Sequence, residues 1–272
     1  MTDKYAVIGN PIEHSKSPFI HQTFAKQTNQ DLTYEKILAP LDGFADKVFE
    51  LIALGYKGVN ITVPFKLQAF QLATKLSPRA QHAGAVNTLS FNGVDIVGDN
   101  TDGAGLVRDI EHNLQIQIAE KRILLIGAGG AAEGVLQPLL TCKPALLVMT
   151  NRTLAKAEAM VSKVKAGSDT SVCVCALDDL HAQQFDIVIN ATSTGLSDGV
   201  LPLPPTIFSQ NCLAYDMMYG RETPFMRLAR SHGARVVDGL GMLVEQAGEA
   251  FYGWRGIRPT TPEVIRMIKE SA

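Results

Sequence analysis

Residues 122–134 have the sequence RILLIGAGGAAEG, in which an unbroken apolar run leads directly into a glycine-rich loop. The apolar run is typical of a strand that is buried on both faces of a parallel sheet. The loop fits the pattern G-x-G-x-x-A, in which the first glycine permits a tight turn and the second lets the backbone approach a pyrophosphate. The N-terminus of the helix that follows would offer its free N–H groups to this anion. The stretch therefore predicts a dinucleotide site, with a purely structural turn as the alternative.

The residues after the next predicted strand, 145–149, bear on the choice of dinucleotide. They are Thr150-Asn151-Arg152-Thr153. NAD-specific sites usually have an acidic residue here, whereas an arginine accommodates the 2′-phosphate of NADP. Arg152 therefore favours NADP. The alternative is a solvated arginine beside a helix that Thr153 caps.

Strand and helix patterns alternate along the whole chain. The second part continues from 122–126 with strand patterns at 145–149, 171–175, 187–191, 213–216 and 235–238, as in a doubly wound domain. The first part has strand patterns at 5–8, 33–38 and 58–63, helical patterns at 18–29, 44–54 and 66–74, and a hairpin signal at Asn92-Gly93. A helix is expected at 102–113, and residues 242–272 are again helical. We expect an α/β protein of two domains with mainly parallel sheets, since 272 residues exceed most single cores.

Composition narrows the classes of partner. The 25 basic and 27 acidic residues give a net charge of −2, which predicts no nucleic-acid surface. No apolar run reaches the roughly 18 residues of a membrane helix, and the first residues lack the features of a signal peptide. The four cysteines and six histidines show no metal-binding spacing. We expect a cytoplasmic protein that binds small molecules, with no metal and no membrane partner.

Four polar clusters in the first part of the chain are candidates for a substrate site. They are HSKSP at 14–18, NITVPFK at 60–66, GAVNT at 84–88 and GDNTDG at 98–103. Asn60 and Thr62 share one face of their predicted strand, and Lys66 follows its carboxyl end, where ligands of open α/β sheets bind. Hydroxyl and amide side chains of this kind suit a polyhydroxylated substrate, and paired serines at a helix N-terminus suit a carboxylate. Helix caps and turn formers are the alternatives for the serines and for Asn87.

The four clusters, the glycine-rich loop, Asn151-Arg152-Thr153, YDMMY at 215–219 and DGLGMLVEQA at 238–247 together resemble the shikimate dehydrogenase family. The resemblance covers essentially the whole chain. It implies the reversible, NADPH-dependent reduction of 3-dehydroshikimate to shikimate, a step in the synthesis of aromatic amino acids. It also implies a substrate-binding domain of residues 1–101, completed by helices within 240–272, and an NADP-binding Rossmann domain of residues 102–239. The protein would be a monomer or a homodimer.

The same resemblance implies a role for each matching position. Lys66 and Asp102 would form the catalytic pair. The substrate would be bound by Ser15, Ser17, Asn60, Thr62, Asn87, Tyr219 and Gln246. NADP would be bound by Gly127, Ala128, Gly129, Gly130, Ala131, Asn151, Arg152, Thr153, Lys156, Met217 and Gly239.

The chemistry supports the role of Lys66, because hydride reduction of a ketone develops an alkoxide that needs a positioned proton donor or cation. A surface lysine is the alternative for Lys66, and a helix N-cap is the alternative for Asp102. The chain departs from the family pattern at Glu133 and Lys156, where many members have arginine, and at Pro78, where many have an acidic residue.

Two other functions compete with this prediction. One is a quinate/shikimate dehydrogenase that uses NAD, which Arg152 disfavours. The other is a non-catalytic dinucleotide sensor, which the presence of both Lys66 and Asp102 disfavours.

Overall fold

The computed structural model describes residues 2–165, 170–194 and 200–271. The chain forms two compact units, a first unit of Met1–Leu106 and Leu243–Ala272 and a second unit of Val107–Met242. It passes between them inside two helices, α5 (Asp102–Arg108) and α9 (Leu240–Arg255). Each unit is built on a six-stranded sheet, so the predicted α/β fold class is confirmed.

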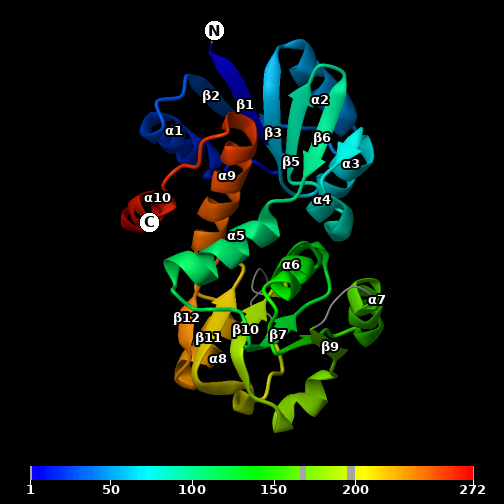
Figure 1. The fold of residues 1–272 in the computed structure, drawn as a ribbon, viewed down its shortest axis with the longest axis vertical. Helices are drawn as coiled ribbons and strands as arrows, with labels where there is room; N and C mark the ends of the chain where they lie inside the picture. The colour runs from blue at the N-terminus through cyan, green and yellow to red at the C-terminus, as the bar shows by residue number, and fades with distance from the viewer. Residues whose placement is uncertain (1, 166–169, 195–199, 272) are drawn as a thin grey trace. The chain divides into compact units, whose positions relative to one another are not determined.

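The first unit has a mixed sheet with the strand order β2-β1-β3-β5-β6-β4 (Figure 1). Its strands are β1 (Asp3–Gly9), β2 (Leu32–Leu38), β3 (Tyr56–Ile61), β4 (Lys75–Leu76), β5 (Thr88–Asn92) and β6 (Asp95–Asp99). The strand β5 runs antiparallel to β3 and β6, whereas the other neighbours pair in parallel. The predicted hairpin forms at Gly93, whose φ of +65° a glycine adopts without strain.

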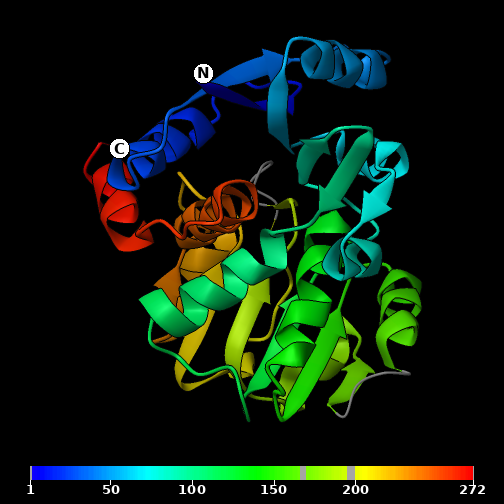
Figure 2. The ribbon, with the colours of Figure 1, turned by 45° about the horizontal axis from the view of Figure 1, so that its top comes forward.

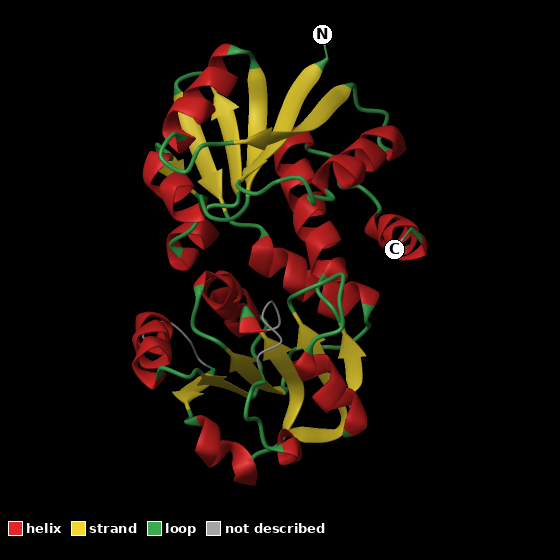
Figure 3. Cartoon of the chain, turned by 180° about the vertical axis from the view of Figure 1, so that it is seen from behind, coloured by secondary structure: helices red, strands yellow, loops and turns green. Residues whose placement is uncertain are grey.

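Helices cover both faces of this sheet (Figure 3). Alternate residues of β1 point to opposite faces, so this strand contributes side chains to two separate core clusters. Ala6 and Ile8 pack in one core cluster with α2 (Phe44–Ala53). Tyr5 and Val7 pack in another, against Trp254 of α9. The remaining helices are α1 (Ser17–Gln27), α3 (Lys66–Leu72), α4 (Pro78–Ala83) and α10 (Thr261–Glu270).

The second unit has a parallel sheet with the order β12-β11-β10-β7-β8-β9. The strands are β7 (Arg122–Ile126), β8 (Leu146–Thr150), β9 (Ser171–Val174), β10 (Phe185–Asn190), β11 (Phe208–Asp216) and β12 (Arg235–Val237). Its longer helices are α6 (Gly130–Thr141), α7 (Leu154–Lys165) and α8 (Pro224–Ser231). Figure 2 shows α6 along one face of the sheet. The strand order reverses between β7 and β10, which is where doubly wound sheets bind dinucleotides.

Several elements differ from the sequence-based expectations. The helices α4 and α8 were not expected, although each begins with a hydroxyl N-cap, Ser77 or Thr223, followed by proline. They have six and eight residues, fewer than the roughly 11 to 18 over which helical periodicity is recognised in a sequence. The helix expected at 102–113 changes at Asp109 into a π-helical turn, closed by a hydrogen bond from the Leu114 N–H to the Asp109 carbonyl (2.9 Å).

Two properties of the described residues bear on possible partners. None of their helices has both the length and the apolar character that a membrane crossing needs. Nor do those residues contain a group of three or more His, Cys, Asp or Glu side chains placed to hold a metal ion.

Candidate active site

Lys66 and Asp102 form an ion pair in the first unit. Lys66 begins α3 a few residues beyond the end of β3, and Asp102 begins α5 just beyond the end of β6. The Lys66 Nζ donates to Asp102 Oδ2 at 2.5 Å. The lysine side chain is 33% exposed and the aspartate side chain only 13%, so the lysine is the member of the pair more open to a ligand.

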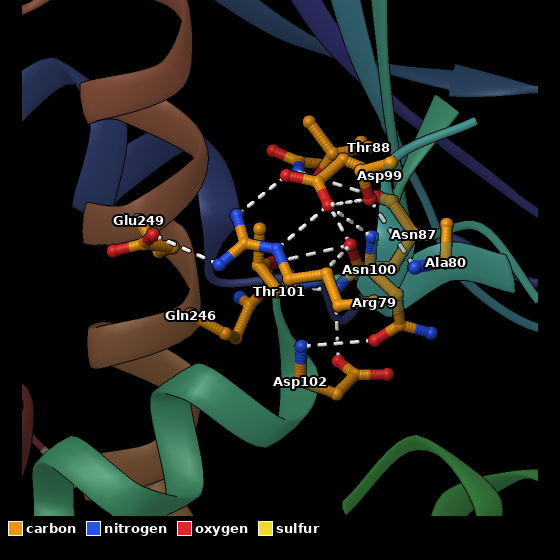
Figure 4. Close-up of polar contacts among 12 residues, drawn as sticks. Arg79, Ala80, Asn87, Thr88, Asp99, Asn100, Thr101, Asp102, Gln246 and Glu249 are labelled. Atoms are coloured by element: carbon orange, nitrogen blue, oxygen red, sulfur yellow. Dashed lines mark hydrogen bonds and ion pairs between the residues drawn. The ribbon is translucent and has the colours of Figure 1, made fainter. Parts of the chain in front are cut away.

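Asn87 joins Asp102 of this pair to the helix α9 (Figure 4). Its side chain is buried, and its Nδ2 lies 2.8 Å from Asp102 Oδ1 and 3.3 Å from Gln246 Oε1 of α9. The Asn87 Oδ1 accepts the Thr101 N–H at 2.9 Å. Asn87 therefore holds the strand-end loop that carries Asp102 and reaches a helix about 160 positions further along the chain.

Asn60 extends the network toward the start of the chain. Its Nδ2 donates to Thr88 Oγ1 at 3.0 Å, and its Oδ1 accepts the Tyr34 hydroxyl at 2.7 Å. Burial raises the pKa of Tyr34 well above its ordinary value, and a hydrogen bond with Ser17 partly offsets this effect. Ser15 Oγ in turn accepts the Ser17 N–H at 3.3 Å, so it also contributes to the start of α1.

One continuous polar network thus connects seven of the residues expected at the substrate site. They are Ser15, Ser17, Asn60, Asn87, Gln246, Asp102 and Lys66. Two other expected residues have different contacts. Thr62 follows β3 and its N–H donates to the Ile8 carbonyl at 2.9 Å, whereas Tyr219 belongs to the second unit, where burial raises its pKa.

Three connecting residues are not among those that the sequence predicts for the site. Thr88 and Thr101 stand inside the polar clusters at 84–88 and 98–103, which was a usable signal. Tyr34 stands in an alternating strand, where its pattern is that of an ordinary core aromatic.

The glycine-rich loop of the second unit has space for a ligand. Gly127 has a φ of +113°, and a Cβ there would lie 3.2 Å from the Ala191 backbone at the end of β10. A Cβ at Gly129 or Gly130 would meet nothing within 4 Å. The helix α6 begins at Gly130 and no side chain caps its N-terminus, so its first N–H groups fit a pyrophosphate.

The residues expected around the 2′-phosphate follow β8. Asn151 Nδ2 donates to the Thr153 carbonyl at 2.8 Å, which fixes the turn into α7. Arg152 and Lys156 are both exposed. The acidic departure Glu133 lies near the start of α6 and pairs with Lys163 at 2.8 Å. Two exposed cations in one turn fit a phosphate, and the pairing with Lys163 offsets part of the Glu133 charge.

Met217 and Gly239, both expected at the nicotinamide, are in contact. A Cβ at Gly239 would lie 2.3 Å from the Met217 carbonyl oxygen, and the Gly239 N–H donates to the Met218 carbonyl at 2.8 Å. Buried Asp216 holds this turn, because its carboxylate accepts the Met218 N–H (3.0 Å) and the Thr223 hydroxyl (2.6 Å). Only a glycine fits the close approach at position 239.

Comparisons with known proteins agree with this geometry. The sequence model of the shikimate dehydrogenase substrate binding domain matches residues 7–89, and that of shikimate / quinate 5-dehydrogenase matches residues 109–197. A protein named shikimate dehydrogenase (NADP(+)) from Methylobacillus flagellatus is 60% identical, over 98% of this chain and 99% of that protein.

Two solved structures are also similar. An Ael1 enzyme from Pseudomonas putida has a TM-score of 0.94 and 48% identity, over 98% of each chain. Shikimate 5-dehydrogenase from Thermus thermophilus, in complex with NADP(H) and shikimate, has a TM-score of 0.88 and 29% identity, over 100% of each chain. The family expected from the sequence is confirmed: the chain belongs to the shikimate dehydrogenase family.

Proposed function

We propose that this protein is an oxidoreductase that reversibly reduces 3-dehydroshikimate to shikimate with NADPH. The observation that carries the proposal is the Lys66–Asp102 ion pair, which stands in one hydrogen-bonded network with Asn60, Asn87 and Gln246 in a chain of this family. The relative from Methylobacillus flagellatus bears the name of this activity, and the structure from Thermus thermophilus contains NADP(H) and shikimate.

The first unit would bind the substrate. Ser15 and Ser17 would take its carboxylate, because they lie together at the start of α1, where the helix dipole favours an anion. Asn60, Thr62, Asn87 and Gln246 would bind its hydroxyl groups, and the family resemblance also assigns Tyr219 to the substrate. Amide and hydroxyl side chains both donate and accept, as hydroxyl groups do, so this donor set matches a polyhydroxylated ring.

Lys66 and Asp102 would carry out the proton transfer that accompanies hydride transfer. In the direction of reduction, Lys66 Nζ donates a proton to the oxygen that becomes negatively charged, and in the reverse direction it accepts one. Asp102 Oδ2 holds Nζ in place, and Asn87 orients the other carboxylate oxygen. Bound NADPH supplies the hydride. A pure dinucleotide sensor would have no use for this pair.

The second unit would hold the cofactor. Gly127, Ala128, Gly129, Gly130 and Ala131 would surround the pyrophosphate, with Asn151, Arg152, Thr153 and Lys156 at the 2′-phosphate and Met217 and Gly239 at the nicotinamide. The open space at Gly129 and Gly130 and the exposed cations after β8 support this assignment.

The domains proposed from the sequence are a substrate-binding domain of residues 1–101 with 240–272 and an NADP-binding domain of residues 102–239. The compact units change at Leu106/Val107 and at Met242/Leu243, which supports a division close to these bounds. We also propose a cytoplasmic monomer or homodimer that binds no nucleic acid.

The test is an assay of the purified chain with shikimate or quinate, each with NADP or NAD, followed by the absorbance of the reduced nicotinamide. We expect shikimate with NADP to give the highest kcat/KM. Quinate with NAD as the preferred pair would instead favour a quinate/shikimate dehydrogenase. Tight NADPH binding without turnover of either substrate would favour the sensor and overturn the proposal.

A further inference from the structure

Arg79, which is outside the sites assigned above, makes a two-sided contact in the first unit (Figure 4). It lies in the first turn of α4 and its side chain is 32% exposed. Its Nε donates to Asp99 Oδ1 at 2.7 Å, and its Nη2 donates to Asp99 Oδ2. The Nη1 atom donates to Glu249 Oε1 of α9 at 2.9 Å. One planar guanidinium thus joins the end of β6 to α9.

The first partner, Asp99, begins the loop that carries Asp102. The backbone N–H groups of the next three residues each donate to a side-chain oxygen. Asn100 N–H bonds to Asp99 Oδ1 (2.8 Å), Thr101 N–H to Asn87 Oδ1 (2.9 Å) and Asp102 N–H to Asn100 Oδ1 (3.1 Å). Side-chain hydrogen bonds therefore determine the backbone conformation of this loop. The first of these side chains is that of Asp99, to which Arg79 donates two hydrogen bonds.

The second partner, Glu249, stands three residues after Gln246 on α9. Residues at this spacing lie on the same side of a helix. Gln246 Oε1 lies 3.3 Å from both Asn87 Nδ2 and Thr101 Oγ1. Arg79 therefore fixes the same face of α9 that presents Gln246 to the network.

Arg79 supplies the positive charge between the carboxylates of Asp99 and Glu249. Burial works to raise the pKa of Asp99, but the hydrogen bonds and charge of Arg79 and further hydrogen bonds outweigh it and hold the pKa below its usual value. The pKa of Glu249 is lowered in the same way, against burial, by Arg258 and Arg79. Without Arg79, Asp99 would lose its bidentate partner while remaining mostly buried, and the tie between β6 and α9 would be lost.

We propose that Arg79 is a positioning residue for the reaction. It holds the 99–102 loop and α9 together, which keeps the side chains of Asp102 and Gln246 in the relative position that the substrate needs. This inference rests on the proposed function. It adds a residue that touches neither substrate nor cofactor and acts through Asp99 and Glu249.

The test compares steady-state constants of the full chain and its variants with shikimate and NADP. Arg79→Gln should lower kcat about tenfold or more and raise the KM for shikimate, since small misplacements of catalytic groups are costly. The Kd for NADPH, followed by fluorescence, should stay within about twofold, because the cofactor residues belong to the second unit. Arg79→Lys keeps the charge without the planar fork and should fall between the wild type and Arg79→Gln.

Lys75→Gln is the matched control. Lys75 pairs with Asp95 at 2.7 Å between β4 and β6 of the same sheet, but its side chain is 64% exposed and contacts no residue of the network. It should retain the wild-type constants, as exposed pairs contribute little. If Arg79→Gln behaves like Lys75→Gln, Arg79 has no positioning role.

A second variant keeps the inference testable if Arg79→Gln does not fold. Glu249→Gln leaves the Arg79–Asp99 contact in place and weakens the link to α9, together with the Arg258–Glu249 pair (2.7 Å), so the KM for shikimate should rise with little change in kcat. An unchanged KM in Glu249→Gln would overturn the role of Arg79 at α9. A wild-type chain that does not oxidise shikimate would instead contradict the proposed function itself.

Discussion

The Nζ atom of Lys66 lies 2.5 Å from Oδ2 of Asp102, although 36 positions separate the two residues in the chain. The contact arises because β3 and β6 both lead to the same edge of the first sheet. Asp102 is further held by Asn87 through its other oxygen. A lysine held by a carboxylate in this way fits the proposed transfer of a proton to and from a substrate oxygen.

The first prediction concerns Lys66. Lys66→Ala should lower kcat by at least ~10²-fold, the lower range for loss of a positioned acid/base group, with little change in the KM for shikimate. Steady-state kinetics with shikimate and NADP measure both constants. Lys57→Ala, which removes an exposed lysine from β3, is the control. A near-normal kcat with a greatly raised KM would mean that Lys66 only binds substrate.

The second prediction concerns the Tyr34 hydroxyl. Tyr34→Phe removes the donor to Asn60 Oδ1 and the link to Ser17. A neutral hydrogen bond contributes ~0.5–1.5 kcal/mol, so the KM for shikimate should rise roughly 3- to 10-fold with kcat nearly unchanged.

Tyr56→Phe is the matched control for this variant, because the buried Tyr56 on β3 bonds to Glu35 instead of a residue expected at the substrate. Equal constants in both variants would contradict a role for Tyr34 in holding Asn60.

The third prediction concerns the choice of cofactor. Arg152 and Lys156 should give NADP a preference of roughly a hundredfold or more, taking ~1.5–3 kcal/mol for each charged hydrogen bond. Arg152→Asp should erase or invert this preference, mainly through weaker NADP binding. Glu133→Arg should tighten NADP with little change in kcat. The measurement is kcat/KM with NADP and with NAD at fixed shikimate and fixed ionic strength, since salt screens exposed charges.

Lys143→Asp makes the same change of charge at the opposite end of the second sheet, just before β8, and should leave the cofactor ratio unchanged. If the wild type uses both cofactors equally and Arg152→Asp does not alter the ratio of the two kcat/KM values, Asn151-Arg152-Thr153 does not bind the 2′-phosphate.

The fourth prediction concerns stability at acidic pH. His21 is 1% exposed, its ring stacks on Tyr34 with centroids 4.2 Å apart, and burial lowers its pKa to about 3. The unfolded chain binds a proton at His21 near pH 6.5, whereas the folded chain does not until about pH 3. The stability that His21 contributes is therefore complete above pH 6.5 and is lost as the pH falls below it.

Between pH 7 and pH 5.5, the free energy of unfolding should fall by about 1 kcal/mol through this residue, at ~1.4 kcal/mol per pKa unit. Urea unfolding at both pH values measures it. His21→Phe keeps an aromatic ring but cannot titrate, so its stability should change less over this range. Identical pH dependence in the two proteins would mean that the folded chain binds a proton at His21 as readily as the unfolded chain does, and would contradict the lowered pKa.

The sequence by itself determined those features that depend on local spacing. The apolar run 122–126 followed by glycines predicted the central strand and the dinucleotide loop, because a strand, a tight turn and a helix start each have a local residue pattern. Arg152 at the end of the next strand indicated NADP for the same reason. The positions of Lys66 and Asp102 at strand ends also followed from the sequence, since parallel strands bring their carboxyl ends to one edge.

Only the tertiary structure decided which side chains connect these positions. Arg79 lies in a helix of six residues that the patterns did not predict, although the Ser77-Pro78 cap was a usable signal. Its partners stand 20 and 170 positions away. Tyr34 has the pattern of a core aromatic, and its hydroxyl partner is set by the pairing of β2, β1 and β3. Hydrogen bonds between side chains far apart in sequence depend on how strands and helices pack, and no local spacing of residues records that packing.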